Sequence, residues 1–389
     1  MIVLALALLP RPAHAIPAWA RRYNVNCSFC HSPSVPRLNA TGIGFKWAGY
    51  RMPEDLGSKV DVTKIENYLS ARVIAAYDYA TRKNAGTEAD AFSVPSASVF
   101  AAGPMGTHFG GYLEFERLPD ATVDLIGSMT GVWGSEQRFG GFRVGQGHML
   151  MAAGGVAGFD RPTGISMPLA YDESVTDAVP LRLGGDQGGI EAFLVLGGRN
   201  RTAVQIVNGV VAGAGMEGRA VSKRDIVLTN QLMWDDVGSG LGLAAYFGTV
   251  TGVVANQPDL GKQYVRLAAT ANKIVGRYEL MGGYVYGKDS DVPVDSASTL
   301  TRSPAGQSYW AQGQYTFKRS PLSVFGRYEF VDPDRDAVDR SRQRYVLGAV
   351  LPINVPEYLR WSIELFRDSY RSAATPERNG LSTQLQFVF

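Results

Sequence analysis

Cysteine and histidine are scarce in this chain, which has only two cysteines and four histidines among its 389 residues. Structural zinc sites combine several Cys and His ligands at characteristic spacings, and no second cysteine pair is present to complete such a set. Basic and acidic residues nearly balance, with a formal net charge of +2, which gives no electrostatic basis for a nucleic-acid partner. The composition therefore argues against zinc-binding and nucleic-acid-binding proteins.

Long apolar runs are also missing beyond the N-terminus. No stretch there approaches the ~20 consecutive apolar residues that a membrane-spanning helix requires. Glycine (45), tyrosine (18) and phenylalanine (17) are by contrast abundant. A chain rich in glycine and aromatic residues, without a helical span, is typical of a β-rich protein of either the soluble or the outer-membrane type.

The N-terminus has the pattern of a targeting segment. A short apolar stretch over 2–9 precedes an A-x-A cleavage signature at 13–15. The positively charged region that normally comes first is missing, so we expect the true start upstream. A buried strand is the alternative, but Pro10 and Pro12 disfavour it. We therefore predict a signal peptide over 1–15 and export of the mature chain.

The two cysteines stand in Cys27-Ser28-Phe29-Cys30-His31. This C-x-x-C-H pattern is typical of c-type haem attachment, in which two thiols add to the porphyrin vinyl groups and the adjacent imidazole reaches the iron. We predict one covalent haem c, with Cys27 and Cys30 as its anchors and His31 as the proximal iron ligand. A disulfide between the cysteines is the alternative. Export favours the haem, because c-type haem is attached outside the cytoplasm.

Two residues are candidates for the second axial ligand of the iron. Met52 follows His31 after a turn-rich stretch that can fold back over the porphyrin, and a methionine ligand raises the reduction potential. Methionine also fills irregular apolar cores, so a packing role is the alternative for Met52. His108 is the rival ligand, because it shares strand parity with Tyr112 and Glu114 and is expected to face an interior.

After residue 69 the chain becomes a series of segments in which apolar and polar residues alternate. Such segments of ~10 residues are typical of a transmembrane β-barrel with a wet lumen, although a soluble sandwich gives a similar pattern. Export, the number of segments and the aromatic C-terminal residue Phe389 favour the barrel. We predict sixteen strands, near 70–81, 92–102, 107–117, 122–134, 139–148, 189–198, 202–212, 225–235, 241–251, 263–272, 276–288, 307–318, 321–331, 343–352, 357–369 and 380–389.

With an even number of strands, the first and the last strand both have their chain ends on the periplasmic side. Short links are then expected on that side and long links outside the cell. Most predicted links obey this asymmetry, while the link 213–224 requires one strand to shift. The third external link, 149–188, is unusually long, and we expect it to fold into the lumen. A mobile surface loop is the alternative. Residues expected to line a constriction there are Met149, Met151, Asp160, Asp172 and Glu173.

The N-terminal part resembles one family. Around the haem motif it reads Ile16-Pro17-Ala18-Trp19, then Pro36-Arg37-Leu38-Asn39, Gly44-Phe45-Lys46 and Gly49-Tyr50-Arg51-Met52-Pro53. This resembles the fused outer-membrane monohaem cytochrome–porins of iron-oxidising bacteria, specifically over 16–55 and only in architecture beyond. The resemblance implies a haem segment inserted in a porin, oxidation of extracellular Fe(II) as electron donor, and delivery of electrons to a periplasmic c-type cytochrome or other carrier.

We therefore expect a haem c cytochrome domain over 16–69 and a porin-like, 16-stranded antiparallel barrel over 70–389, in contact with lipid of the bacterial outer membrane. The expected activity is that of an iron:cytochrome oxidoreductase. Outward electron transfer to an external acceptor remains open, as does a solute porin plugged by the haem segment. Asp289, Asp332 and Asp334 of the outer links are candidates for concentrating Fe(II), with loop solvation as their more ordinary role.

Overall fold

The computed structural model describes residues 18–32, 37–84, 86–118, 122–146, 162–209, 224–250, 262–290, 292–293, 301–337, 339–353, 359–372 and 375–388. Several predictions fall outside these residues: the signal peptide, Met149, Met151, Asp160 and the terminal Phe389.

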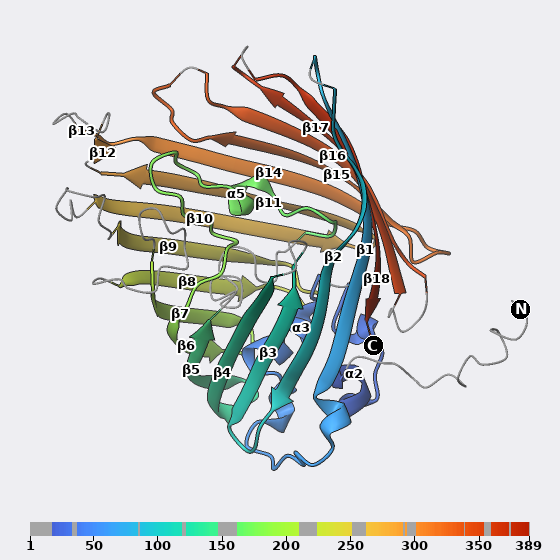
Figure 1. Cartoon of the computed structure of the whole chain (residues 1–389). Helices are drawn as coiled ribbons and strands as arrows, with labels where there is room; N and C mark the ends of the chain where they lie inside the picture. Colours follow the sequence, from blue (N-terminus) through green and yellow to red (C-terminus); the bar gives the residue numbers. More distant parts are fainter. Residues whose placement is uncertain are drawn as a thin grey trace, which may run out of the picture.

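Sixteen antiparallel strands close into one barrel, which confirms the predicted fold class (Figure 1). In chain order the barrel strands are β1 (Leu69–Arg82), β2 (Gly86–Pro104), β3 (Phe109–Arg117), β4 (Val123–Ser135), β5 (Arg138–Gln146), β6 (Gly189–Leu196), β7 (Asn200–Val207), β8 (Asp225–Met233), β9 (Gly240–Val250), β10 (Lys262–Val275), β11 (Tyr278–Asp289), β14 (Ala305–Thr316), β15 (Ser323–Asp332), β16 (Arg342–Pro352), β17 (Leu359–Tyr370) and β18 (Arg378–Val388). Strands β12 (Val292–Pro293) and β13 (Thr301–Arg302) form a separate pair. Each predicted segment overlaps one barrel strand, and β1 closes the barrel by pairing with β18.

The alternation of side chains decides which face of each strand looks inward. In β7 every second side chain, from Arg201 to Val207, is buried, while Thr202, Val204 and Ile206 between them are exposed. Because the side-chain period of a strand is two residues, a slip of one position in register would exchange the two faces.

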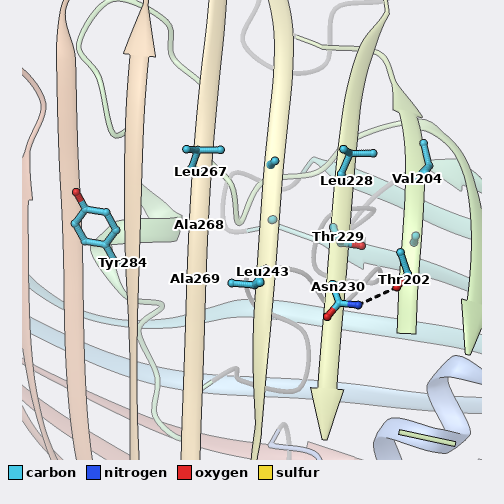
Figure 2. Close-up of a pocket in the computed structure, with 13 residues that line it drawn as sticks. Thr202, Val204, Leu228, Thr229, Asn230, Leu243, Leu267, Ala268, Ala269 and Tyr284 are labelled. Carbon is cyan, nitrogen blue, oxygen red and sulfur yellow. Dashed lines mark hydrogen bonds between the residues drawn. The ribbon is translucent and has the colours of Figure 1, made fainter. Parts of the chain in front are cut away.

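The outer face is apolar. Leu228, Leu243 and Leu267 are each more than two-fifths exposed on it. Figure 2 shows these side chains with Val204 and Tyr284 around a shallow apolar depression that crosses neighbouring strands. An apolar band of this kind is stable in contact with lipid hydrocarbon. Among the described residues, no helix combines the length and apolar character needed to cross a membrane.

The two ends of the barrel differ in the length of their links. Strands β4 and β5 are joined by residues 136–137 and β10 and β11 by residues 276–277, whereas links at the opposite end include 147–188 and 208–224. The predicted asymmetry is therefore confirmed, and 208–224 lies at the long-link end without any change in strand number. Outer-membrane barrels place short turns in the periplasm, so we call the short-link end the periplasmic end.

Residues 162–188, here called the inward loop, fold into the barrel and confirm that prediction. They include the helix α5 (Leu169–Asp172), which lies inside the barrel wall (Figure 1). Tyr171 of α5 is fully buried and accepts a 3.0 Å hydrogen bond from the indole of Trp310. Other apolar side chains of the loop pack on inner-wall residues of β7 to β14, including Val227, Tyr246 and Val285. The inward loop and this side of the wall therefore share a buried apolar core.

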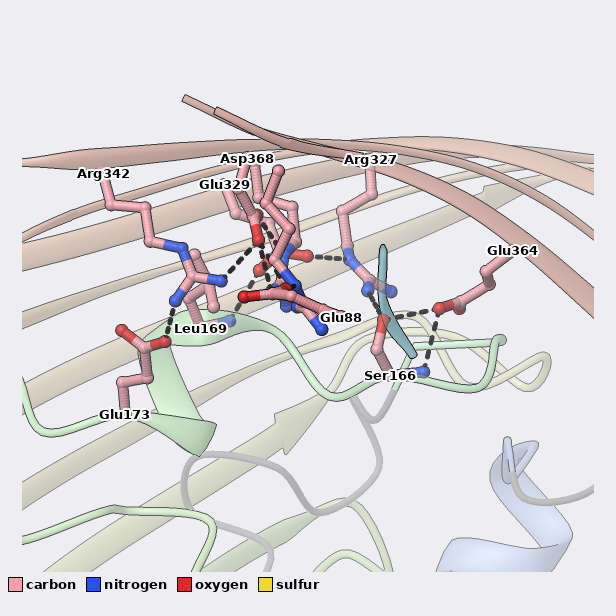
Figure 3. Close-up of polar contacts among 11 residues, drawn as sticks. Glu88, Ser166, Leu169, Glu173, Arg327, Glu329, Arg342, Glu364 and Asp368 are labelled. Atoms are coloured by element: carbon pink, nitrogen blue, oxygen red, sulfur yellow. Dashed lines mark hydrogen bonds and ion pairs between the residues drawn. The ribbon is translucent and has the colours of Figure 1, made fainter. Parts of the chain in front are cut away.

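Buried charges tie the inward loop to the wall (Figure 3). Glu364 accepts hydrogen bonds from the backbone N–H groups of Ile165 (2.7 Å) and Ser166 (3.1 Å). Glu329, ion-paired with Arg327, accepts one from the backbone N–H of Leu169 at 2.6 Å. These carboxylates satisfy backbone donors that burial would otherwise leave without partners.

Glu173, expected with Asp172 to line a constriction, forms an ion pair with Arg342 of β16, while Asp172 is exposed. A lining role for these two residues stays a prediction. The sequence interpretation of Asp289, in contrast, is wrong. Asp289 is fully buried and binds the Arg266 guanidinium at 2.6 Å and the Thr176 hydroxyl at 2.6 Å. Asp289 therefore anchors the inward loop and does not face solvent as a collector of Fe(II).

Candidate haem site

The N-terminal segment, residues 18–68, lies inside the periplasmic end of the barrel (Figure 1). It consists of α2 (Ala18–Tyr23), the 3-10 turn η1 (Cys27–Phe29), α3 (Ala40–Trp47) and the 3-10 turns η2 (Pro53–Asp55) and η3 (Ile65–Asn67). The barrel follows directly at Leu69, one residue before the predicted boundary.

Helix α3 fixes the segment against the inner wall. Asn39 caps its N-terminus by accepting a 3.0 Å hydrogen bond from the backbone N–H of Gly42. Ile43, Trp47 and Ala48 then pack against apolar inner-wall residues of β4 to β8, namely Val132, Phe139, Phe193, Val195, Ala203 and Met233. The Trp47 indole N–H donates to the Gln231 side chain at 3.0 Å. Burial of this face holds α3 inside the barrel.

The segment also makes close backbone and polar contacts at the periplasmic turns. Arg51 donates to the backbone carbonyls of Gly106 (2.9 Å) and Phe109 (2.7 Å). Gly110 must be glycine, because a Cβ there would lie 1.9 Å from the carbonyl oxygen of Gly49. The segment is thus fitted to the wall and is not a loosely tethered domain.

The C-x-x-C-H motif forms one tight turn. The backbone N–H groups of Cys30 (3.2 Å) and His31 (2.9 Å) both donate to the carbonyl of Cys27. Positions separated by three and four residues share one face of a helical turn, so the two thiols and the imidazole are brought together. No disulfide joins Cys27 to Cys30 in this structure. Burial raises the pKa of the Cys30 thiol to about 11.

A backbone carbonyl orients the proximal imidazole. His31 Nδ1 lies 3.2 Å from the carbonyl oxygen of Arg37, and a β-bridge joins His31 to Leu38. Metal-binding histidines characteristically use one ring nitrogen for such a bond, which fixes ring orientation and tautomer for the other. The contact gives His31 the setting of an axial ligand.

Met52 lies in the same apolar cluster as the motif. It is 5% exposed and packs with Phe45 and Tyr50, and Cys30 adjoins this cluster. The remaining neighbours are Trp19, Tyr23 and Tyr112. The structure thus places Met52 in a cluster that Cys30 of the motif adjoins, and its role as a second axial ligand stays a prediction.

The expected orientation of His108 is wrong. His108 stacks on Trp133 with ring centroids 5.6 Å apart, and its Nδ1 lies 3.2 Å from the carbonyl oxygen of Val132. Trp133 is 42% exposed and packs with Phe109 and Phe142 on the outer face. Strand parity fails here because His108 precedes β3 and belongs to the turn, whose backbone does not keep the pleat.

The donor set fits a covalent c-type haem. Cys27, Cys30 and His31 share one turn, the His31 imidazole lies beside a backbone carbonyl, and Cys30 adjoins the aromatic cluster that contains the Met52 thioether. His and Met are the axial pair of cytochromes c. Cys27 and Cys30 would anchor such a group covalently, His31 would bind its iron, and Met52 would be a candidate for a further iron ligand.

Two tyrosines to which the sequence assigned no role connect this site to the barrel wall. Tyr50 stacks on Trp19 (ring centroids 5.3 Å apart) and on Tyr112 of β3 (5.8 Å). Tyr50 has φ +63°, an uncommon conformation for an aromatic residue. Tyr112 donates to Glu114, which pairs with Arg72 at 3.1 Å. The only signal in the sequence for this stack of aromatic rings was the alternation of side chains that places Tyr112 on the inner face of its strand.

Comparisons with known proteins bear on the fold. No protein-family profile and no curated protein matches the chain in sequence. Among solved structures, it is similar to an anion-selective porin from Comamonas acidovorans (TM-score 0.59, 14% identity), covering 82% of this chain and 98% of the porin. It is also similar to the outer-membrane protein OmpT of Vibrio cholerae (0.54, 11%; 82% and 99%) and to Salmonella typhi OmpF (0.54, 12%; 82% and 97%).

These similarities agree with the physical features of the barrel. The closed strand order, the apolar outer face and the porin-like fold together place the chain in the bacterial outer membrane, as the sequence predicts. Outer-membrane lipid is accordingly a partner of the outer face.

Proposed function

We propose that the chain is an outer-membrane electron-transfer protein that oxidises extracellular Fe(II) at one covalent haem c and passes the electron to a periplasmic carrier. The observation that carries this proposal is the packing of Met52 and Cys30 in one aromatic cluster, inside a segment fitted to the periplasmic end of a porin-like barrel. Fe(II) as the donor rests on the resemblance of residues 16–55 to cytochrome–porins.

The wall opposite the inward loop carries partly exposed charges. The inward loop packs on the side of β7 to β14, whereas Arg72 and Glu116 on the opposite wall are exposed over 27% and 18% of their side chains. Arg72 donates to both Glu116 and Glu114, and Glu114 accepts a hydrogen bond from Tyr112, which packs against the cluster of Met52. A cation that binds at Glu116 would therefore be connected to this cluster through Arg72, Glu114 and Tyr112.

The chemistry required of the protein is modest. The bound haem supplies a one-electron acceptor, so that one Fe(II) gives one Fe(III) and one electron. The residues of the chain hold the group and exclude water: Trp19, Phe45 and Tyr50 surround Met52. Oxidation outside the cell suits this substrate. Fe(III) precipitates near neutral pH, so a cell benefits if Fe(II) is oxidised without being imported.

A solute porin is the second candidate, and the porin-like fold supports it directly. Partly exposed ion pairs on the inner wall, such as Arg72 with Glu116, are compatible with a porin of modest selectivity. The two functions make opposite demands on the N-terminal segment. Electron transfer requires the segment to stay in place in the barrel, whereas a solute porin requires it to leave a path through the lumen.

The direct test mixes oxidised, haem-loaded protein with anaerobic Fe(II) and follows the haem absorbance. We expect rapid conversion of the ferric to the ferrous spectrum, with no such change in a Cys27→Ala/Cys30→Ala variant that cannot attach haem. A haem that stays ferric at every pH tested contradicts the Fe(II) proposal. Large, steady single-channel currents through the haem-loaded protein in planar bilayers favour the solute porin instead.

A further inference from the structure

Arg143 of β5 is a fully buried cation without a hydrogen-bond partner for its two terminal nitrogens. Its Nε donates to the Thr130 hydroxyl at 3.3 Å, while the nearest carboxylate, Glu191, is 3.9 Å from Nη1. Burying a charged group without such partners is strongly unfavourable, and unpartnered buried donors are rare in folded proteins.

Glu191 is already engaged by its other neighbours. One carboxylate oxygen pairs with the Arg201 guanidinium, and the other accepts from the Gln205 side chain at 3.0 Å. Arg201, Glu191 and Arg143 are all fully buried on the inner wall. Glu191 therefore does not satisfy Arg143, whose two terminal nitrogens still lack an acceptor.

Arg143 lies next to the turn that leads into Met52. Its register partner on β4 is Thr130, whose methyl group lies 3.5 Å from where a Cβ of Gly49 would stand. Gly49 is followed directly by Tyr50 and lies three residues before Met52. The unpartnered guanidinium thus faces the same part of the N-terminal segment that carries Met52.

We propose that Arg143 binds a buried carboxylate between the N-terminal segment and the inner wall, and that this carboxylate is a propionate of the haem. The inference rests on the proposed function, because the haem is its source of the anion. A guanidinium is the side chain best matched to a carboxylate, through two parallel hydrogen bonds. Arg143 is fully buried, which favours an anion that enters with the segment over a solute that must diffuse in.

The test is a thermodynamic cycle between Arg143 and the haem. Arg143→Met is made in the haem-attaching chain and in the Cys27→Ala/Cys30→Ala chain, and thermal unfolding in detergent is followed for all four proteins. We expect Arg143→Met to lower the unfolding temperature of the haem-loaded protein, and to leave unchanged or raise that of the haem-free protein, where it removes an unpaired charge. Arg327→Met, a control on β15, should have the same effect in both backgrounds.

The haem midpoint potential gives a second readout. Loss of a cation near the porphyrin favours the ferric state, so Arg143→Met should lower the reduction equilibrium constant about tenfold, or ~59 mV for a one-electron couple. Arg143→Lys, which keeps the charge, should lie closer to the wild type and covers the case in which the methionine variant fails to assemble.

Three results overturn the inference. One is an effect of Arg143→Met on unfolding that is equal with and without haem, together with an unchanged potential. Another is stabilisation of the haem-free protein by added phosphate or acetate that Arg143→Met abolishes, since the anion is then a solute. The third is an absorption spectrum which shows that the chain carries no covalent haem. Failure of Fe(II) to reduce a haem whose potential responds to Arg143 rejects only the proposed donor.

Discussion

Arg37 and Glu279 form a buried ion pair across 242 positions of sequence, with the Arg37 Nε 3.1 Å from the Glu279 carboxylate. Arg37 also donates to the carbonyl of Leu38 at 2.9 Å, and Glu279 accepts a second hydrogen bond from Asn272 at 2.9 Å. The pair joins the stretch after the C-x-x-C-H motif to the start of β11. The N-terminal segment and the barrel wall are therefore one folded unit at this point.

Removing one partner of this pair should destabilise the segment. Glu279→Ala leaves the Arg37 guanidinium buried without its carboxylate, which costs about 3–5 kcal/mol in such cases. We expect faster proteolysis within residues 18–68 and a lower unfolding temperature. Arg199→Ala is the control, because its pair with Asp236 is largely exposed and exposed pairs contribute little. Equal proteolysis of both variants would contradict the role given to Glu279.

The second axial ligand can be identified by spectroscopy. Met52→Ala should convert the low-spin ferrous and ferric spectra to high-spin forms and lower the midpoint potential, because the thioether ligand is lost. His108→Ala should leave the haem spectrum unchanged, since His108 stacks on the outward Trp133. Loss of the low-spin spectrum in the His108 variant, with Met52→Ala unaffected, would reverse the assignment.

The raised pKa of Cys30 predicts a slow thiol before haem is attached. Burial favours the protonated form, so in a haem-free Cys27→Ala chain the alkylation rate of Cys30 should rise with a midpoint near the pKa of about 11. At pH 8 the reaction should be roughly a hundredfold slower than that of a free thiol with its pKa near 8.5. The pH–rate profile with iodoacetamide measures this directly, and a midpoint near 8.5 would mean that the thiol is not buried.

The hydrogen bonds that hold the inward loop against the wall should limit the current that passes through the lumen. Glu364→Ala removes the acceptor of the backbone N–H groups of Ile165 and Ser166 and of the Ser166 hydroxyl. Because these donors then lack partners, we expect the loop to detach more often, giving larger or noisier single-channel currents. Glu377→Ala, which removes a more exposed pair with Arg367, is the control. Currents that are identical in the two variants would show that Glu364 does not hold the loop.

Much of the barrel could be predicted because strand alternation is a local property. In β7 the side chains that read as polar or small, such as Gln205 and Ala203, are those buried inside, and the apolar Val204 and Ile206 face outward. The strand count and the inward course of residues 162–188 followed from this alternation and from link lengths. The cysteines and His31 were evident for the same reason, since a five-residue motif forms within one turn.

Contacts between distant residues were not predictable. Nothing in the neighbourhood of Asp289 reveals that it meets Arg266 and Thr176, and its position near a strand end instead suggested an exposed carboxylate. The stack of Tyr50 on Tyr112 depends on how α3 docks in the barrel. Likewise His108 was assigned from strand parity that does not extend into its turn, and the unpartnered state of Arg143 becomes visible only when every neighbour is placed.

Electron transfer across a lipid bilayer tests the central claim most directly. Haem-loaded protein is inserted into vesicles that contain an oxidised soluble c-type cytochrome as a stand-in for the periplasmic carrier, and Fe(II) is added outside under anaerobic conditions. The account predicts reduction of the enclosed cytochrome at a rate proportional to the inserted protein, and none with the Cys27→Ala/Cys30→Ala chain. Enclosed cytochrome that stays oxidised, in vesicles whose inserted protein carries haem and passes small solutes freely, would contradict it.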